Sequence, residues 1–221
     1  MEKMIEYLEV LEKSGLFGRI EGKDILCMLD CLGVKNRSFL KGEYVFRYGE
    51  KIHSIALLLS GKVCIESTDF WGERHILGVI TPGEIFAEAY AFNQEMMLND
   101  VIAEEMSLVL FLNAEKVLRT CSSSCPFHTS LIDNLFCMIA RKNRNLVQKI
   151  NQVTKRSTRE KVLSYLSDQA KKCGNNQFSI PLNRQALADY LAVDRSALSS
   201  VLSRLRDEKI IEFHKNEFKL L

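Results

Sequence analysis

Long hydrophobic runs are missing from this sequence. The longest apolar stretch, around residues 55–59, is far shorter than the ~20 apolar residues that cross a membrane as a helix. The opening residues Met1-Glu2-Lys3-Met4 lack the basic segment and the apolar run of a secretory signal peptide. These absences argue against a membrane-spanning helix and a secreted protein, and we expect a cytoplasmic protein without a membrane partner.

Proline and glycine are also sparse, at 3 and 11 of 221 residues, while 47% of the residues are hydrophobic. This composition excludes a collagen-like or low-complexity chain and is too apolar for an intrinsically disordered one. The length suffices for one or two domains, each with a core of its own. The 7 cysteines cannot all pair within one chain because their number is odd, which agrees with a reducing compartment.

Charge is unevenly distributed, although the formal net charge is only +2. Residues 1–120 contain 13 basic and 19 acidic residues, whereas residues 121–221 contain 17 basic and 9 acidic residues. An acidic N-terminal part joined to a basic C-terminal part is typical of a chain whose C-terminal part binds a polyanion. An ordinary solvated basic face is the alternative explanation.

Short β-strands are expected in the middle of the N-terminal part. Helical spacing of apolar residues covers 4–16, and a second short helix is expected at 23–29. From residue 41 to 112, runs of strand-forming residues alternate with glycine turns. The expected strands lie at 44–46, 55–59, 62–65, 75–80 and 108–112. Many short strands with regular turns predict a sandwich or a jelly-roll barrel.

Helical periodicity returns after Pro126. One stripe follows heptad spacing: Ile132, Phe136, Ile139, Asn143, Leu146, Ile150 and Val153. This spacing predicts a seam with a partner helix, most simply a second copy of the same helix, in which Asn143 fixes the register. A long helix buried within one chain, with Asn143 turned to solvent, is the alternative. A second stripe is expected to pack on the β-domain: Leu131, Leu135 and Met138.

The C-terminal part has the pattern of a helix-turn-helix. Helical patterns cover 158–172, 184–191 and 195–209. Asn183 and Asp194 are good N-caps for the last two helices, which a short turn at 192–194 separates. Two short helices joined by such a turn predict a motif whose second helix enters the major groove of DNA.

The second helix of this motif exposes small polar residues beside arginine. Small side chains allow close approach to base edges, and Arg195 can form a bidentate pair with guanine, while its neighbours suit phosphate oxygens. The expected DNA-binding residues are Asn183, Arg184, Arg195, Ser196, Ser199, Ser200, Ser203, Arg204 and Arg206. A hairpin over 210–220 is expected as a wing. A small helical domain that docks on another protein is the alternative.

With these elements placed, the whole chain resembles the CRP/FNR family of bacterial transcription regulators. Residues 42–46, 49–50, 59–63 and 82–86 are similar to the β-roll signature of that family, and residues 158–163, 183–191 and 193–199 to its DNA-binding module. The resemblance implies an α+β chain. It places a cyclic-nucleotide-binding-like β-roll (jelly roll) with N-terminal helices at 1–126, a dimerisation helix at 127–154 and a winged helix-turn-helix domain at 155–221.

The same resemblance implies partners and an effector pocket. It implies a homodimer that binds double-stranded DNA at a pseudo-palindromic operator, and RNA polymerase as a protein partner. In members that bind cyclic AMP, an acid bonds the ribose and an Arg-Ser/Thr pair binds the phosphate. Here Glu88 keeps the position of the acid, but Leu98 and Asn99 replace the pair, with Asp100 beside them. Burying a phosphate without a cation is costly, so we expect an unidentified effector other than cyclic AMP, with Glu88 as a structural acid.

The positions of the cysteines do not identify a cofactor. Cys27 and Cys31 lie near the region where oxygen sensors of the family hold an iron–sulfur centre, but four thiolates are the usual requirement. Their spacing instead favours a buried helix face. Cys121, Cys125 and His128 precede the long helix. They could hold a metal with one more ligand, the two thiols could form a reversible disulfide, or all three could be coincidental loop residues.

We expect a regulator rather than an enzyme, because no convincing nucleophile–base pair or metal constellation is evident in the sequence. The competing interpretation is a cyclic-nucleotide-binding-like regulatory subunit that acts on a protein partner. Such a subunit needs no DNA-facing helix, so residues 180–211 count against it.

Overall fold

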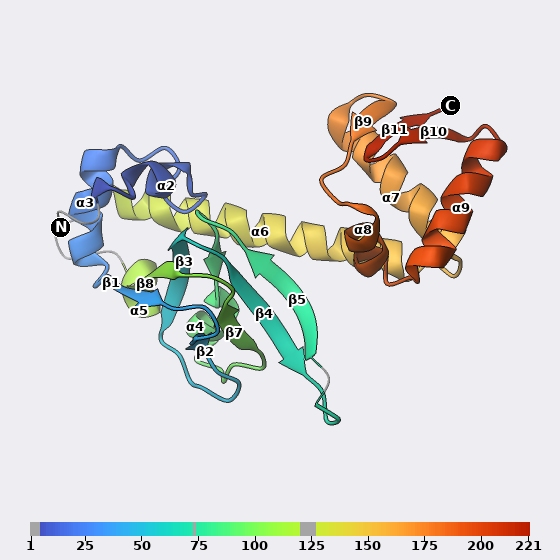
Figure 1. The fold of residues 1–221 in the computed structure, drawn as a ribbon. Coiled ribbons are helices and arrows are strands. Elements are labelled where there is room, and N and C mark those ends of the chain that lie inside the picture. The colour runs from blue at the N-terminus through green and yellow to red at the C-terminus, as the bar shows by residue number, and fades with distance from the viewer. Residues whose placement is uncertain (1–4, 73, 120–126) are drawn as a thin grey trace. The chain divides into compact units, whose positions relative to one another are not determined.

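The computed structural model describes residues 5–72, 74–119 and 127–221. The chain divides into two compact units, Met1–Ile139 and Ala140–Leu221. The division falls inside one continuous helix, α6 (Phe127–Val153), drawn in yellow in Figure 1. The sequence places the ends of this helix at 127 and 154 but gives no sign that its two halves belong to different units.

Two antiparallel four-stranded sheets make up most of the N-terminal unit (Figure 1). One has the order β1 (Lys35–Phe39), β8 (Ser107–Asn113), β3 (Ser54–Ser60), β6 (Ile85–Phe86), and the other β2 (Tyr44–Phe46), β7 (Asp100–Ala103), β4 (Val63–Thr68), β5 (Arg74–Ile80). Phe46 joins the sheets, because its ring lies 6.2 Å from that of Phe86 and 5.7 Å from that of Phe111. The predicted two-sheet β-domain is confirmed.

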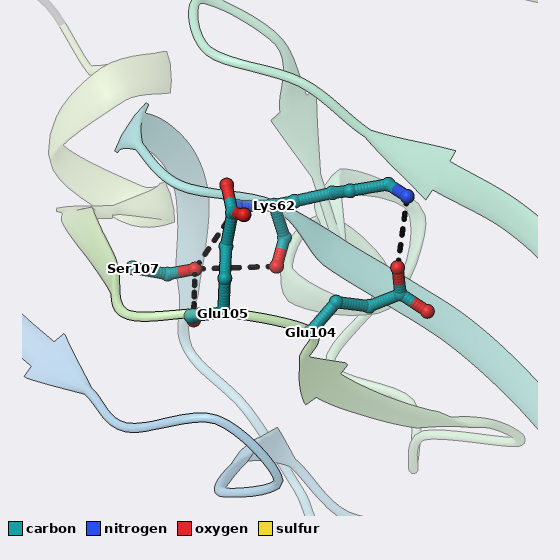
Figure 2. A network of polar contacts seen from close by, with 4 residues as sticks. All are labelled: Lys62, Glu104, Glu105 and Ser107. Carbon is teal, nitrogen blue, oxygen red and sulfur yellow. Dashed lines mark hydrogen bonds and ion pairs between the residues drawn. The ribbon is translucent and has the colours of Figure 1, made fainter.

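A serine ties together two of the connections between the sheets. Figure 2 shows the Ser107 hydroxyl next to the backbone of Lys62 and Glu105. Its Oγ accepts from the Lys62 N–H at 3.1 Å and lies 2.9 Å from the Glu105 carbonyl oxygen, while Lys62 Nζ pairs with Glu104 at 2.9 Å. Gly61 has a φ of +87°, and a Cβ there would overlap Ser107. Only glycine therefore suits this crossing without strain.

Short helices cover the N-terminal unit: α2 (Leu8–Lys13), α3 (Gly22–Cys31), α4 (Glu88–Asn93) and α5 (Ala114–Leu118). Helix α3 buries Ile25, Met28 and Leu29. Cys27 and Cys31 are exposed, so the prediction that they lie on the buried face is wrong. The larger aliphatic side chains of α3 take the core positions, because they bury more apolar area per residue than a thiol does.

The first half of α6 is built into this unit. Leu131 and Leu135 are buried in the core of the β-domain, and Met138 packs against it, which confirms the predicted stripe. The side-chain amide of Asn134 donates to the carbonyl oxygens of Leu16 at 3.1 Å and Gly18 at 2.6 Å. These contacts fix α6 to the segment that connects α2 and α3.

The C-terminal unit is a winged three-helix arrangement (Figure 1). Its elements are α7 (Thr158–Cys173), β9 (Gln177–Ser179), α8 (Arg184–Leu191), α9 (Arg195–Asp207), β10 (Ile211–His214) and β11 (Glu217–Leu220). Helix α7 starts with a capping box between Ser157 and Glu160 and ends at Gly174. The sheet order is β10-β11-β9, so the predicted hairpin gains a third strand that the sequence did not reveal.

Candidate functional site

Helices α8 and α9 form the expected helix-turn-helix. The Asn183 side chain accepts from the Ala186 N–H at 2.9 Å, and the Asp194 side chain accepts from the Ser196 N–H at 2.7 Å. Each cap satisfies a backbone donor that its helix leaves unpaired. Ala192, between the helices, adopts a φ of +49° and turns the chain. Leu187 and Leu198 are fully buried, so α9 is held with a defined face outward.

The outward face of α9 contains Arg195 and Ser200, both exposed. Ser196 and Ser199 use their hydroxyl hydrogens locally, since Ser196 donates to Asp194 at 2.5 Å and Ser199 donates to the Arg195 carbonyl oxygen at 3.0 Å. Hydrogen bonds, led by that from the Ser196 hydroxyl, hold the pKa of Asp194 below its ordinary value. The side chains best placed to donate to a ligand on this face are therefore Arg195 and Ser200.

Residues flanking this face also have local partners. Ser203 is half-buried and Arg204 is exposed. The guanidinium of Arg184, the first residue of α8, lies 5.2 Å from the ring of Phe213 and donates to the Lys215 carbonyl oxygen at 3.3 Å. The structure therefore holds Arg184 against the wing, a contact that the sequence, which predicts Arg184 at phosphate oxygens, does not reveal.

A lysine that the sequence does not single out supports the turn. Lys161, on α7, donates to the carbonyl oxygens of Leu191 and Ala192, each at 3.2 Å. These carbonyls lie at the end of α8, where a helix leaves acceptors unpaired and favours a cation. Lys161 thereby fixes the turn that orients α9. A lone lysine in an amphipathic helix gives no sequence signal of this role.

A surface cavity of about 620 Å³ lies where α8 meets the wing. It is lined by Ser179, Arg184, His214, Lys215, Asn216 and Glu217. Two of these residues are permanently cationic, and the cavity opens on the unit that carries the excess of basic residues.

The predicted heptad seam on helix α6 is exposed. Phe136 is 73% exposed, Leu146 is 60% and Ile150 is 56%. Ile132 is half-buried, and Ile139 and Asn143 are exposed. The alternative in which this helix is buried within one chain is therefore wrong for the seam face.

The expected effector-pocket residues lie around α4. Glu88 is the first residue of α4 and is half-buried, while Leu98 is 62% exposed. The Asn99 side-chain amide donates to the Tyr90 hydroxyl of α4 at 3.1 Å. Asp100 accepts from the backbone N–H of Tyr48 at 2.8 Å, so its carboxylate stabilises the loop before β3.

Cys121 and Cys125 lie outside the described residues, so the structure does not test the proposed thiol site. His128 is described, and it is 1% exposed with no hydrogen-bond partner for Nδ1. Within 5–72, 74–119 and 127–221, no group of three His, Cys, Asp or Glu side chains is arranged to hold a metal ion. In the same ranges no helix is long and apolar enough to span a bilayer.

Comparison with known proteins matches both units. A family model for a cyclic nucleotide-binding domain covers residues 36–124, and one for a Crp-like helix-turn-helix domain covers residues 160–221. The transcriptional activator protein FnrA of Stutzerimonas stutzeri is 25% identical over 198 residues, which cover 87% of this chain and 79% of that protein.

Solved structures share the fold. The catabolite activator protein of Thermus thermophilus superposes with a TM-score of 0.52 at 21% identity, over 94% of both chains. CprK in complex with OCPA gives a TM-score of 0.64 at 16% identity, over 100% of this chain and 91% of that chain. At these identities the likeness concerns the fold alone.

Proposed function

Because this chain belongs to the CRP/FNR family of DNA-binding transcription regulators, we propose that it binds operator DNA as a homodimer joined along α6. The exposed seam carries this proposal. Phe136, Leu146 and Ile150 each expose more than half of their side chain, and a row of large apolar side chains at heptad spacing is normally covered by another helix. A second copy presents the same row, so a two-fold seam buries both at once.

The dimer presents two recognition helices. Each α9 offers Arg195 to a guanine edge, while the surrounding basic residues neutralise phosphates. Two-fold symmetry then requires a pseudo-palindromic operator with half-sites roughly one helical turn, ~34 Å, apart. Affinity falls steeply with salt because phosphate contacts release counterions.

The β-roll responds to an effector other than cyclic AMP. Leu98 places an exposed isobutyl group where the family places its phosphate-binding arginine, and Asn99 bonds to Tyr90. A neutral or apolar effector fits these side chains better than an anion does. The protein acts by binding and not by catalysis, at promoters in the cytoplasm, with RNA polymerase as its protein partner.

Selection from a pool of random duplexes tests the core of this proposal. Wild-type protein should enrich an inverted repeat, and sedimentation should show two chains on each selected duplex. Enrichment of a single half-site by one chain would contradict the dimer. Failure to retain any duplex at low salt would contradict DNA binding itself.

A further inference from the structure

An aromatic ladder crosses the wing sheet. Phe213 of β10 pairs with Phe218 of β11, which pairs with Phe178 of β9. The rings of Phe213 and Phe218 are stacked at 5.7 Å and those of Phe218 and Phe178 at 6.3 Å. Phe178 and Phe218 are 6% and 1% exposed and belong to the core, whereas Phe213, at the edge, is half-buried.

Two arginines from different helices gather at this outermost ring. The guanidinium of Arg184, at the start of α8, lies 5.2 Å from the Phe213 centroid, and that of Arg206, in the last turn of α9, lies 5.6 Å from it. Both distances fall within the range in which a cation is attracted to the face of an aromatic ring. Arg184 is half-buried, and this burial lowers the pKa of its guanidinium.

We propose that Phe213 is a positioning residue for DNA binding, which holds Arg184 and Arg206 in place before a phosphate arrives. The inference rests on the proposed DNA-binding function and adds a role for the wing. A free arginine loses rotamer freedom when it binds a phosphate, and an arginine already packed on a ring loses less. Because one ring serves both helices, it also fixes the distance between the two cations.

If Phe213 served only to pack the wing, its substitutions would change DNA affinity in a different pattern. Phe218 and Phe178 are buried members of the core of this unit, whereas Phe213 is half-buried and packs against that core from its edge. Leucine in its place keeps apolar volume but removes the aromatic face, and tyrosine keeps the face. The two substitutions therefore separate packing from cation binding.

The experiment measures affinity for a random-sequence duplex over a series of salt concentrations. The duplex has about 40 base pairs, which is long enough for both recognition helices of a dimer to contact it. Phe213→Leu should weaken binding by about fivefold, which corresponds to ~1 kcal/mol. Phe213→Tyr should bind as the wild type does. In an Arg206→Gln background the effect of Phe213→Leu should shrink, because one of the two cations that it positions is gone.

Full retention of affinity in Phe213→Leu, or an unchanged effect in the Arg206→Gln background, would overturn the positioning role and leave DNA binding intact. Loss of duplex binding by the wild type would instead overturn the proposed function. Nitrogen relaxation of the arginine Nε groups in the wild type, without DNA, needs no variant to fold. Arg184 and Arg206 should be more ordered than the exposed Arg204, and equal mobility of the three would contradict the inference.

Discussion

The two units retain the family fold but differ in what they keep on their surfaces. In the C-terminal unit, Asn183 and Asp194 cap the two helices of the motif and Arg195 stands exposed at its front. In the N-terminal unit the sheets and the tight turn at Gly61 are intact, yet Leu98 and Asn99 stand where the resemblance to the family places an Arg-Ser/Thr pair. A chain can therefore keep the buried apolar residues that determine its fold and still lack the few surface groups that bind a given ligand.

Substitutions in the α6 seam, which runs through both units, should have the largest effect on dimerisation and DNA affinity. Ile139→Asp with Leu146→Asp places two charges per chain opposite their copies, so the dimer should dissociate. DNA affinity should fall at least about a hundredfold, because each half-site is then bound alone. Sedimentation and duplex titration measure the two effects.

A matched pair of substitutions controls for added negative charge. Asn145→Asp with Asn151→Asp adds the same two negative charges per chain at exposed positions beside the seam. This control should remain dimeric, with only the loss of affinity that added negative charge brings. A dimeric Ile139→Asp, Leu146→Asp variant would show that α6 joins the copies by another face.

Gly61→Ala tests whether the N-terminal core is independent. The methyl group would overlap Ser107 at a residue with positive φ, so this unit should lose about 2–5 kcal/mol of its free energy of unfolding. Hydrogen exchange should show the loss in the β-roll and not in α7–α9. Gly42→Ala is the control. Its φ is +85°, but no described atom lies within 4 Å of the added Cβ, and its loss should be about 1–2 kcal/mol.

Arg195→Ala probes the retained surface of the C-terminal unit. Discrimination at one base per half-site should fall by about 1–3 kcal/mol, while thermal unfolding stays the same. Arg204→Ala should instead weaken binding to all sequences alike and lower the salt slope by about 1. Selected sites that are identical for wild type and Arg195→Ala would remove Arg195 from base recognition.

We expect the N-terminal unit to bind neither cyclic AMP nor cyclic GMP. Leu98 supplies no charge to a phosphate, so calorimetry should detect no binding in the micromolar range. Micromolar affinity would mean that a cation from another position serves the phosphate, and the contrast between the two units would then weaken.

Local signals explain why some elements were predictable. The start of α8 was predicted to the residue and that of α9 to within one residue, because a single capping side chain marks each one. In β1, four of the five residues are exposed, so no apolar alternation is present. That strand forms because it pairs with β8, more than 60 residues away. Strands β6 and β9 have 2 and 3 residues, too few for any period.

Side-chain partners were the least predictable part of the site. Asp100 was noted only as a neighbour of Leu98 and Asn99, and the sequence did not show that its carboxylate accepts from the backbone N–H of Tyr48. Arg184 was expected at a phosphate, and the spacing gave no sign that its guanidinium lies over Phe213, 29 positions later in the chain. Both contacts depend on the folded arrangement of distant segments, which residue spacing does not encode.

Because α6 runs through both units, the number of residues in it sets the rotation about the helix axis between the first and the second half of the seam. The division at Ile139 and Ala140 lies within unbroken helix, where each residue advances the chain by about 100°. One inserted residue would rotate the second half of the seam by that angle against the first half, whereas seven inserted residues would nearly restore the alignment. A change in the length of this helix should therefore disturb the seam more than a change in the length of a surface loop.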